Sequence, residues 1–235
     1  LWRHYDYILV DEFQDISIDR YKLLQALRSD SPKTKLFCVG DDWQSIFRFA
    51  GSDMSLVYEF EKYFGYTEQC KIETTYRFHQ PLIDKSSEFV MKNKEQKEKT
   101  IKTPEGDTKK TYLNFVKCDG GVKKEVEKIV SAIPTNQSIL LLGRYNYDAV
   151  SVGYKGKMNM TENRMTVKVG IREIPFLSVH SAKGLEADNV VVIGARYRDI
   201  EEKCVNYVAA TRARKLLVWA YKTNTRKPKT EYWGG

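Results

Sequence analysis

The sequence lacks the features that mark several other classes of protein. Its four cysteines, Cys38, Cys70, Cys118 and Cys204, form no CxxC pair, so neither a zinc site nor a disulfide framework is expected and a reducing cytosol fits. No apolar run approaches the roughly 18 residues that span a bilayer, and the opening residues, LWRHYDY, contain no apolar signal-peptide core. The three histidines share no metal-ligand spacing. These absences favour a globular cytoplasmic protein, and because the first residue is not Met we expect it to be part of a longer chain.

The composition is that of an ordinary globular protein with a basic surface. Hydrophobic residues make up 42% and charged residues 30% of the 235 residues, which is enough to bury a sizeable core in one large or two small domains. The net charge is +8, and such an excess suits a polyanionic partner such as nucleic acid. Much of the positive charge lies in residues 92–110 and 222–229, where a solvated surface is the commoner explanation.

Strand-like apolar runs alternate with segments of helix length, a pattern typical of α/β folds with largely parallel sheets. Strands are expected at residues 7–10, 35–39, 69–74, 112–116, 139–142, 175–179, 190–193 and 216–220. Helices are expected at residues 18–29, 79–96, 122–133 and 201–213. Residues 151–174, which contain Gly153, Gly156 and Gly170, predict a hairpin, and residues 92–110 predict a linker or exposed excursion.

Polar clusters follow four of the apolar runs. YILV leads to DEFQD, LFCV to GDDWQS, KIETT to YRF, and PFLSV to HSAKG. In parallel α/β sheets, ligands bind at the carboxyl ends of the strands. We therefore expect the four clusters to line one ligand-facing edge.

Two carboxylates, Asp11 and Glu12, directly follow the first apolar run. One carboxylate could hold Mg²⁺ while the other orients and deprotonates an attacking water, and phosphoryl transfer requires both functions. The alternative is an ordinary strand end whose acidic residues, with Asp15 or Ser17, cap the next helix. This stretch by itself leaves both interpretations open.

Residues 39–53, VGDDWQSIFRFAGSD, place further polar side chains after the second apolar run. Phe47 and Phe49 bracket Arg48, and such an aromatic and basic alternation suits stacking on exposed nucleobases. The alternative is a pair of core aromatic residues beside a surface arginine.

Six stretches of the chain resemble, in order, motifs of the UvrD/Rep-type superfamily 1 DNA helicases. VDEFQDIS and VGDDWQSIFRFAGSD are similar to the second and third motifs, and TTYRF (74–78) to the fourth. LLLGRYNYDA (140–149) resembles the segment before the DNA-contacting strand of the second motor domain. SVHSAKGLEADNVVVI (178–193) and NYVAATRARKLLVW (206–219) resemble the fifth and sixth motifs. The DExxQD pattern is only moderately specific, but six motifs in order are highly specific, and GDDWQ with Trp43 is most similar to the helicase IV branch.

This resemblance implies an α/β fold with RecA-like parallel sheets of the P-loop NTPase type. Residues 1–77 would be the C-terminal part of a first motor domain, residues 78–110 a helical or linker segment, and residues 111–235 the second motor domain. The implied activity is that of an ATP-dependent helicase or translocase that moves 3′ to 5′ along single-stranded DNA. ATP and Mg²⁺ would be the cofactors, and single-stranded DNA or a single/double-strand junction the partner.

The resemblance also assigns roles in ATP chemistry. These are Mg²⁺ binding for Asp11, base catalysis for Glu12, sensing of the γ-phosphate or the attacking water for Gln14 and Gln44, adenine packing for Tyr76, γ-phosphate contact for Arg77, ribose or phosphate contact for Gly184 and Glu186, and a second arginine finger for Arg212. A guanidinium stabilises the charge spread over the phosphoryl oxygens, and such a finger contributes roughly 10³–10⁵ in rate.

A second group of residues is implied to contact single-stranded DNA. Its members are Phe47, Phe49, Arg144, Asn146, Ser178 and His180. For His180 alone, an ordinary structural hydrogen bond is the alternative, and Lys183 could serve either phosphates or the fold.

The chain departs from the family pattern in three places. It contains no GxxxxGK[ST] stretch, the loop that cradles phosphates and lies upstream of the DExx strand in the family. We therefore expect the chain by itself to bind ATP poorly and to hydrolyse little or none. The interval between the fourth and fifth motifs is short, which suggests a minimal motor, and the connection between the last two motifs is unusually short.

A catalytically silent DNA-binding or regulatory module that kept the helicase fold is the rival interpretation. Retention of Glu12, Arg77 and Arg212 argues against it, because a protein that does not hydrolyse ATP has little need for a base and two arginine fingers. A nuclease-linked motor is a further possibility.

Overall fold

The computed structural model describes residues 5–29, 33–94, 96–159, 164–194 and 200–221. The chain divides into two compact units, residues 1–71 and residues 72–235. No helix in the described part of the chain is long and apolar enough to cross a membrane.

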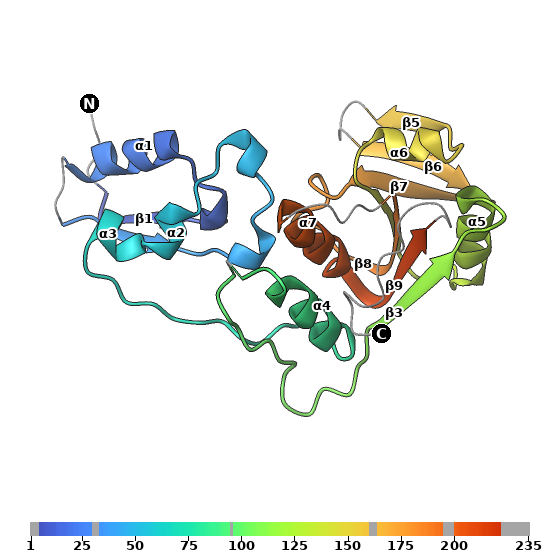
Figure 1. Cartoon of the computed structure of the whole chain (residues 1–235), viewed down its shortest axis with the longest axis horizontal. Helices are drawn as coiled ribbons and strands as arrows, with labels where there is room; N and C mark the ends of the chain where they lie inside the picture. The colour runs from blue at the N-terminus through green and yellow to red at the C-terminus, as the bar shows by residue number, and fades with distance from the viewer. Residues whose placement is uncertain (1–4, 30–32, 95, 160–163, 195–199, 222–235) are drawn as a thin grey trace. The chain divides into compact units, whose positions relative to one another are not determined.

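The first unit is a small parallel β-sheet covered on one face by helices (Figure 1). Its elements are β1 (Tyr7–Val10), α1 (Ile18–Ser29), β2 (Lys35–Cys38), α2 (Ser55–Tyr58) and α3 (Phe60–Phe64). β1 and β2 pair in register from Tyr7 opposite Lys35 to Val10 opposite Cys38.

The two faces of this sheet differ in burial. Ile8 and Val10 point toward a core that contains Phe13, Leu24 and Leu56, and side chains alternate between faces along a strand. The opposite face exposes large apolar side chains, namely Tyr7, Leu9, Phe37 and Val39. Parallel sheets are normally covered on both faces, so this exposed apolar face is unusual for the fold class.

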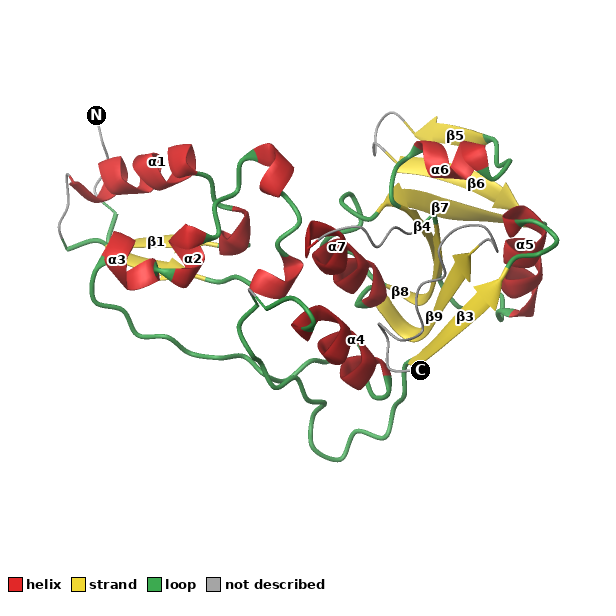
Figure 2. Ribbon diagram, viewed as in Figure 1, coloured by secondary structure: helices red, strands yellow, loops and turns green. Residues whose placement is uncertain are grey.

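The second unit contains a larger sheet with helices around it (Figure 2). Its elements are α4 (Leu82–Met91), β3 (Tyr112–Lys117), α5 (Val122–Ala132), β4 (Ile139–Gly143), α6 (Tyr147–Ser151), β5 (Gly156–Asn159), β6 (Arg164–Val169), β7 (Arg172–Ser178), β8 (Ala187–Ile193), α7 (Ile200–Ala210) and β9 (Ala213–Tyr221). In the described residues these strands form one seven-stranded sheet in the order β3-β9-β8-β4-β7-β6-β5. The strands from β3 to β7 in that order run parallel, whereas β6 and β5 are antiparallel to their neighbours.

Both faces of the larger sheet are buried at its centre. Val191 and Ile193 of β8 belong to the core cluster that includes Val126 of α5, while Val190 and Val192 alternate onto the other face and are equally buried. α7 packs against β9 and α4, and α5 and α7 lie on opposite sides of the sheet in Figure 2. A centre covered on both faces explains why β4 and β8 read as unbroken apolar runs in the sequence.

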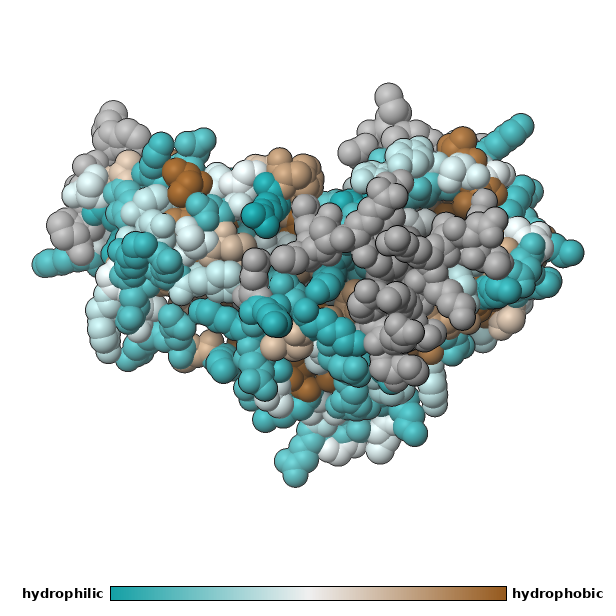
Figure 3. Space-filling model, viewed as in Figure 1, coloured by the Kyte–Doolittle hydropathy of each residue, from teal (hydrophilic) through white to brown (hydrophobic). Residues whose placement is uncertain are grey.

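Charged and polar side chains dominate the surface in view. On the face shown in Figure 3 most described residues are hydrophilic, and hydrophobic residues occur singly or in small groups. Such scattered apolar residues are normal on a protein surface.

The residues between α3 and β3 (65–111) form α4 but otherwise have little regular structure where they are described, and hydrogen bonds join parts of this segment to one another. The backbone N–H of Thr75 donates to the carbonyl of Lys102, and Lys102 donates to the carbonyl of Glu73. The buried ring of His79 lies 3.0 Å from the Asp107 carboxylate through Nε2. Residues 92–110, predicted to be a linker or exposed excursion, form no helix or strand where the structure describes them, and they lie within the second unit.

Most predicted elements are confirmed, with ends that shift by a few residues. The strand at 7–10 and the helix at 18–29 match the structure, and residues 151–174 do form antiparallel pairs. The helix expected at 79–96 is shorter at both ends, because it begins at Leu82, directly after Pro81, and ends at Met91.

Two predictions are wrong. Residues 69–74 form no strand: Ile72 is 86% exposed, and only a single bridge, from Thr74 to Lys102, is present. The four polar clusters consequently do not follow four strands of one sheet, because DEFQD and GDDWQS follow β1 and β2 of the first unit whereas HSAKG follows β7 of the second.

Candidate functional site

The first candidate site lies where β1 and β2 of the first unit end. Asp11 and Glu12 follow β1 and are both exposed. Glu12 has φ +50° and ψ +43°, the left-handed conformation that residues other than glycine seldom adopt. Asp11 Oδ1 accepts a hydrogen bond of 2.8 Å from the Glu12 backbone N–H. Strained backbone of this kind is common at functional sites, where it aims side chains.

A buried glutamine connects this acidic turn to the end of β2. Gln14 is fully buried; its amide nitrogen donates to the Glu12 carboxylate, and its Oε1 accepts from the Asp41 backbone N–H at 2.9 Å. Gln44 Nε2 in turn donates to Asp41 Oδ2 at 2.7 Å. The structure thus brings Glu12, Gln14 and Gln44, three of the predicted catalytic or nucleotide-binding residues, into one hydrogen-bonded set through Asp41.

Gly40 allows the close approach of these two strand ends. A Cβ atom at this position would lie 2.8 Å from Gln14 Oε1 and 3.1 Å from the Gln14 backbone nitrogen. Both distances are shorter than an ordinary contact, so a side chain at this position would force Gln14 to shift.

The acidic turn can contribute to a Mg²⁺ site but does not form a complete one. In the part of the chain that the structure describes, no three His, Cys, Asp or Glu side chains group as metal ligands. Mg²⁺ commonly takes only one or two carboxylates and completes its shell with water and substrate phosphates. The exposed Asp11 carboxylate therefore fits a Mg²⁺ that arrives with a nucleotide.

An aromatic pair follows in the same unit. The rings of Phe47 and Phe49 lie 5.9 Å apart with 42° between their planes, and Phe49 is 68% exposed. Trp43, by contrast, is fully buried and belongs to the core. An exposed aromatic face next to the exposed Arg48 is suited to stacking against a nucleobase.

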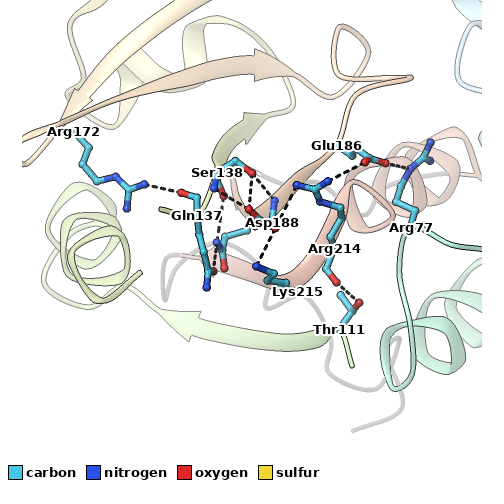
Figure 4. Close-up of polar contacts among 10 residues, drawn as sticks. Arg77, Thr111, Gln137, Ser138, Arg172, Glu186, Asp188, Arg214 and Lys215 are labelled. Carbon is cyan, nitrogen blue, oxygen red and sulfur yellow. Dashed lines mark hydrogen bonds and ion pairs between the residues drawn. The ribbon is translucent and has the colours of Figure 1, made fainter. Parts of the chain in front are cut away.

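The second unit holds a chain of alternating charges that begins at Arg77 (Figure 4). Arg77 Nε donates to Glu186 Oε2 at 2.9 Å, and Glu186 Oε1 also pairs with Arg214 at 3.3 Å. Arg214 reaches Asp188 at 3.3 Å, and Lys215 pairs with the same carboxylate at 3.2 Å. Two of the residues predicted to bind nucleotide, Arg77 and Glu186, are therefore in direct contact.

Asp188 anchors this chain of charges. Partial burial works to raise the pKa of Asp188, but hydrogen bonds from the Ser138 backbone and hydroxyl and from Lys215, together with the Arg214 charge, outweigh it and hold the pKa below its ordinary value. Ser138 donates through its backbone N–H at 3.0 Å and through its hydroxyl at 3.1 Å. Asp188 is thus held as a carboxylate that keeps Arg214 in place beside Glu186.

The other residues predicted to bind nucleotide in this unit differ in exposure. Tyr76 is 79% exposed, and Gly184 is exposed with φ +85°. Arg212 is only 1% exposed, and its guanidinium donates to the carbonyls of Val208 and Leu185. Tyr76 is open to a ligand, whereas Arg212 is part of the protein interior in this structure.

The second candidate edge is formed where β4 and β7 end side by side. Gly143 of β4 is paired with Ser178 of β7, so the residues that follow each strand are neighbours. Arg144 Nε donates to Glu202 at 2.6 Å, and Arg144 Nη1 lies 3.1 Å from His180 Nδ1. Arg144 and His180, both predicted to contact DNA, are therefore brought together.

The other polar candidates at this edge, Asn146, Ser178 and Lys183, lie within three positions of Arg144 or His180 in the sequence. Asn146 is exposed at the start of α6, and the Ser178 hydroxyl hydrogen-bonds the Ser181 hydroxyl at 2.9 Å. Lys183 is half-buried.

The structure adds functional candidates that sequence reasoning missed. The rings of Tyr145 and Tyr147 stack at 5.1 Å with 12° between their planes, and the Arg144 guanidinium lies 4.8 Å from the Tyr145 ring centre. The RYNY pattern contains the same aromatic and basic alternation as residues 47–49 and could have revealed Tyr147. No sequence signal identifies Glu202, because 58 positions separate it from Arg144.

The mostly parallel sheet covered by helices on both faces has the arrangement of a RecA-like fold. A solved helicase of PRRSV covers 93% of this chain and 35% of its own with a TM-score of 0.50 and 18% sequence identity, a likeness that supports the fold alone. Residues 1–65 match the UvrD/REP helicase N-terminal domain, and residues 155–224 match the UvrD-like helicase C-terminal domain. These ranges together cover more than half of the chain, which belongs to the UvrD/Rep helicase family.

Two curated relatives show where the similarity lies. DNA helicase IV of Escherichia coli (strain K12) is 33% identical over 246 residues, a match that covers 93% of this chain and 34% of the relative. The putative ATP-dependent DNA helicase YjcD of Bacillus subtilis (strain 168) is 39% identical over 111 residues, which is 47% of this chain and 14% of the relative. The chain thus spans about a third of the length of the Escherichia coli protein and less of the other.

Proposed function

We propose that this chain is part of an ATP-dependent DNA helicase or translocase that moves 3′ to 5′ along single-stranded DNA or from a single/double-strand junction. The observation that carries the proposal is the acidic turn after β1, where Glu12 adopts a left-handed backbone conformation and is bonded to the buried Gln14. An ordinary helix cap needs neither feature. The free state of all four cysteines agrees with work in the reducing cytoplasm.

In this proposal the first unit supplies the hydrolytic groups. Glu12 accepts the proton of the water that attacks the γ-phosphate, and Gln14 keeps its carboxylate in position. Gln44, which is held by Asp41, senses the phosphate or that water. Asp11 would hold Mg²⁺, which would neutralise phosphate charge when bound.

The second unit supplies the cationic groups in this proposal. Arg77 contacts the γ-phosphate, while Glu186 and Gly184 contact the ribose or phosphates and Tyr76 packs on the adenine. The exposure of Tyr76 supports its part in this assignment. Arg212 acts as the second arginine finger. Because its guanidinium is buried and donates to the Leu185 carbonyl, this role requires that hydrogen bond to break before the guanidinium reaches a phosphate.

The DNA track combines stacking and polar contacts. In the first unit, Phe47 and Phe49 stack on bases. At the edge formed by β4 and β7, the contacts come from Arg144, Asn146, Ser178 and His180, and we add Tyr147 to this set because its ring is exposed and stacked on Tyr145. Base stacking on an aromatic side chain contributes about 1–3 kcal/mol per base.

We further propose that the first motor domain is completed by chain outside these 235 residues, including a phosphate-cradling loop. The exposed apolar face of β1 and β2, with Leu9 and Phe37, supports this, because a two-stranded parallel sheet with one bare face is poorly stabilised. The 235-residue chain alone is accordingly expected to hydrolyse little ATP.

A catalytically silent nucleic-acid-binding or regulatory module is the second candidate. The lack of a GxxxxGK[ST] stretch within these 235 residues is the observation that favours it. Such a module would bind single-stranded DNA but would neither hydrolyse ATP nor move.

Strand displacement by the full-length protein tests the proposal. Partial duplexes with a 3′ tail, a 5′ tail or no tail are incubated with the protein, ATP and Mg²⁺, and the released strand is measured. Release from the 3′-tailed duplex that requires ATP supports the helicase. Binding to every tailed duplex without release, and without ATP-driven movement along a single strand, supports the silent module instead.

A further inference from the structure

We propose that Glu202 is a positioning residue of the DNA-binding edge: through Arg144 it fixes His180 as a neutral imidazole that carries its proton on Nε2. The inference rests on the proposed function, because DNA binding at His180 belongs to that function.

Glu202 lies on α7, and its Oε1 accepts the hydrogen bond from Arg144 Nε at 2.6 Å. Only 8% of the Glu202 side chain and 12% of the Arg144 side chain are exposed. Away from water, a charged pair of this kind is held in one geometry, because either group would lose a strong charge-assisted bond if it rotated away. Glu202 therefore determines where the planar guanidinium of Arg144 points.

The guanidinium then determines the state of His180. Arg144 Nη1 lies 3.1 Å from His180 Nδ1. An arginine has only N–H donors and keeps its proton in proteins, so Nδ1 must be the acceptor. An imidazole that accepts at Nδ1 is uncharged and bears its N–H on Nε2.

This state gives His180 a defined role toward DNA. A neutral ring with its N–H on Nε2 is a hydrogen-bond donor at that nitrogen and adds no positive charge to the edge. Cationic contacts to phosphate release counterions and steepen the salt dependence of binding, whereas a neutral donor does not. Replacement of His180 is therefore expected to weaken binding without a change in the salt slope.

Nitrogen-15 NMR of the imidazoles in the 235-residue chain tests the positioning step directly. With three histidines in the chain, the His180 signals are assigned by their loss in a His180→Gln variant. The expected spectrum has an unprotonated Nδ1 and a protonated Nε2, and both Glu202→Gln and Arg144→Met shift it toward mixed tautomers or imidazolium. Glu202→Gln keeps the shape and an acceptor oxygen, so it tests the charge without opening a cavity.

A matched control removes an ion pair elsewhere in the same unit. Glu125 pairs with Lys128 on α5 at 2.8 Å, and Glu125→Gln is expected to leave the His180 signals unchanged. A proton on Nδ1 in the unaltered chain, or His180 signals that are the same in Glu202→Gln and the unaltered chain, would overturn the inference.

Affinity for a single-stranded oligonucleotide, measured by fluorescence anisotropy, separates this inference from the proposed function. Glu202→Gln is expected to weaken binding several-fold and Arg144→Met about tenfold, the size of one lost hydrogen bond to a charged group. If the unaltered chain binds DNA but Glu202→Gln changes neither the His180 signals nor the affinity, the inference fails and the proposed function stands. If the unaltered chain binds no DNA although the tautomer is as expected, the role of this edge in DNA binding is refuted.

Discussion

Replacement of Gly40 by alanine is expected to loosen the hydrogen-bonded set that holds Glu12. The new Cβ atom would lie 2.8 Å from Gln14 Oε1, 3.1 Å from the Gln14 nitrogen and 3.3 Å from Phe13 Cβ. The Gln14 side chain cannot simply move aside, because it is fully buried and bonded to both Glu12 and Asp41. The clash is therefore relieved by breaking the bond between Gln14 Oε1 and the Asp41 N–H.

The size of the effect follows from these contacts. Overpacking of a well-packed site costs about 1–3 kcal/mol, and the lost hydrogen bond costs about 0.5–1.5 kcal/mol. Partial relief of the clash makes these terms overlap, so we expect a loss of about 2 kcal/mol, which corresponds to roughly thirtyfold in an equilibrium constant.

Amide hydrogen exchange of the 235-residue chain measures this loss at the residue concerned. In Gly40→Ala the Asp41 amide is expected to exchange roughly thirtyfold faster, because exchange reports local opening. Gly120→Ala is the matched control, since its nearest heavy atoms would lie 3.7 Å and 3.8 Å away. Equal Asp41 exchange in Gly40→Ala and the unaltered chain would refute the reasoning about this close approach.

Three further predictions concern stacking, thiol reactivity and acid stability. Tyr147→Ala should weaken single-stranded DNA binding about tenfold in a filter-binding assay, as the loss of one stacked base implies. Tyr112→Ala is the control, because its ring is 54% exposed against 55% for Tyr147, and it should leave binding unchanged. Equal losses in the two variants would contradict this prediction. The exposed Cys70 should react readily with a thiol reagent. Burial raises the pKa of Cys38 to about 12 and should delay its labelling until the protein unfolds. Labelling of both thiols at the same rate would contradict this prediction. Asp188→Asn should lower stability to urea at neutral pH. The pKa of Asp188 is lower in the folded protein than in the unfolded chain, where it is about 4. The contribution of Asp188 to stability is therefore present above the unfolded pKa and is lost as the pH falls through the lower folded pKa. The urea midpoints of the variant and the unaltered chain should accordingly converge in acid.

Local sequence patterns predicted the helices and strands that are marked by a clear apolar run with polar residues at its ends. The strand at residues 7–10 is an apolar run bounded by Asp6 and Asp11, and it forms as expected. Residues 69–74, QCKIET, contain the β-branched Ile72 and Thr74 but lack a neighbouring strand, and strand formation depends on such partners. Pairing partners lie far away in the sequence, so this failure could not be seen there.

The same distinction holds for the candidate site. Glu12 and Gln14 lie two positions apart, and the structure joins them by a hydrogen bond. The burial of Arg212 and the contact between Arg144 and Glu202 arise only when distant segments pack together. A sequence names the residue types that suit a reaction, but the state in which each side chain is held depends on the fold.

The most direct test of the central claim is ATP hydrolysis by the full-length protein with and without single-stranded DNA, beside Glu12→Gln and, as a control, Glu61→Gln. Glu61 is an exposed carboxylate on α3 of the same unit and has no assigned role. We predict turnover that DNA stimulates, that survives Glu61→Gln and that collapses in Glu12→Gln while DNA binding remains. Equally negligible turnover in the unaltered protein and in Glu12→Gln, with tight DNA binding by both, would contradict the motor and leave a silent DNA-binding module.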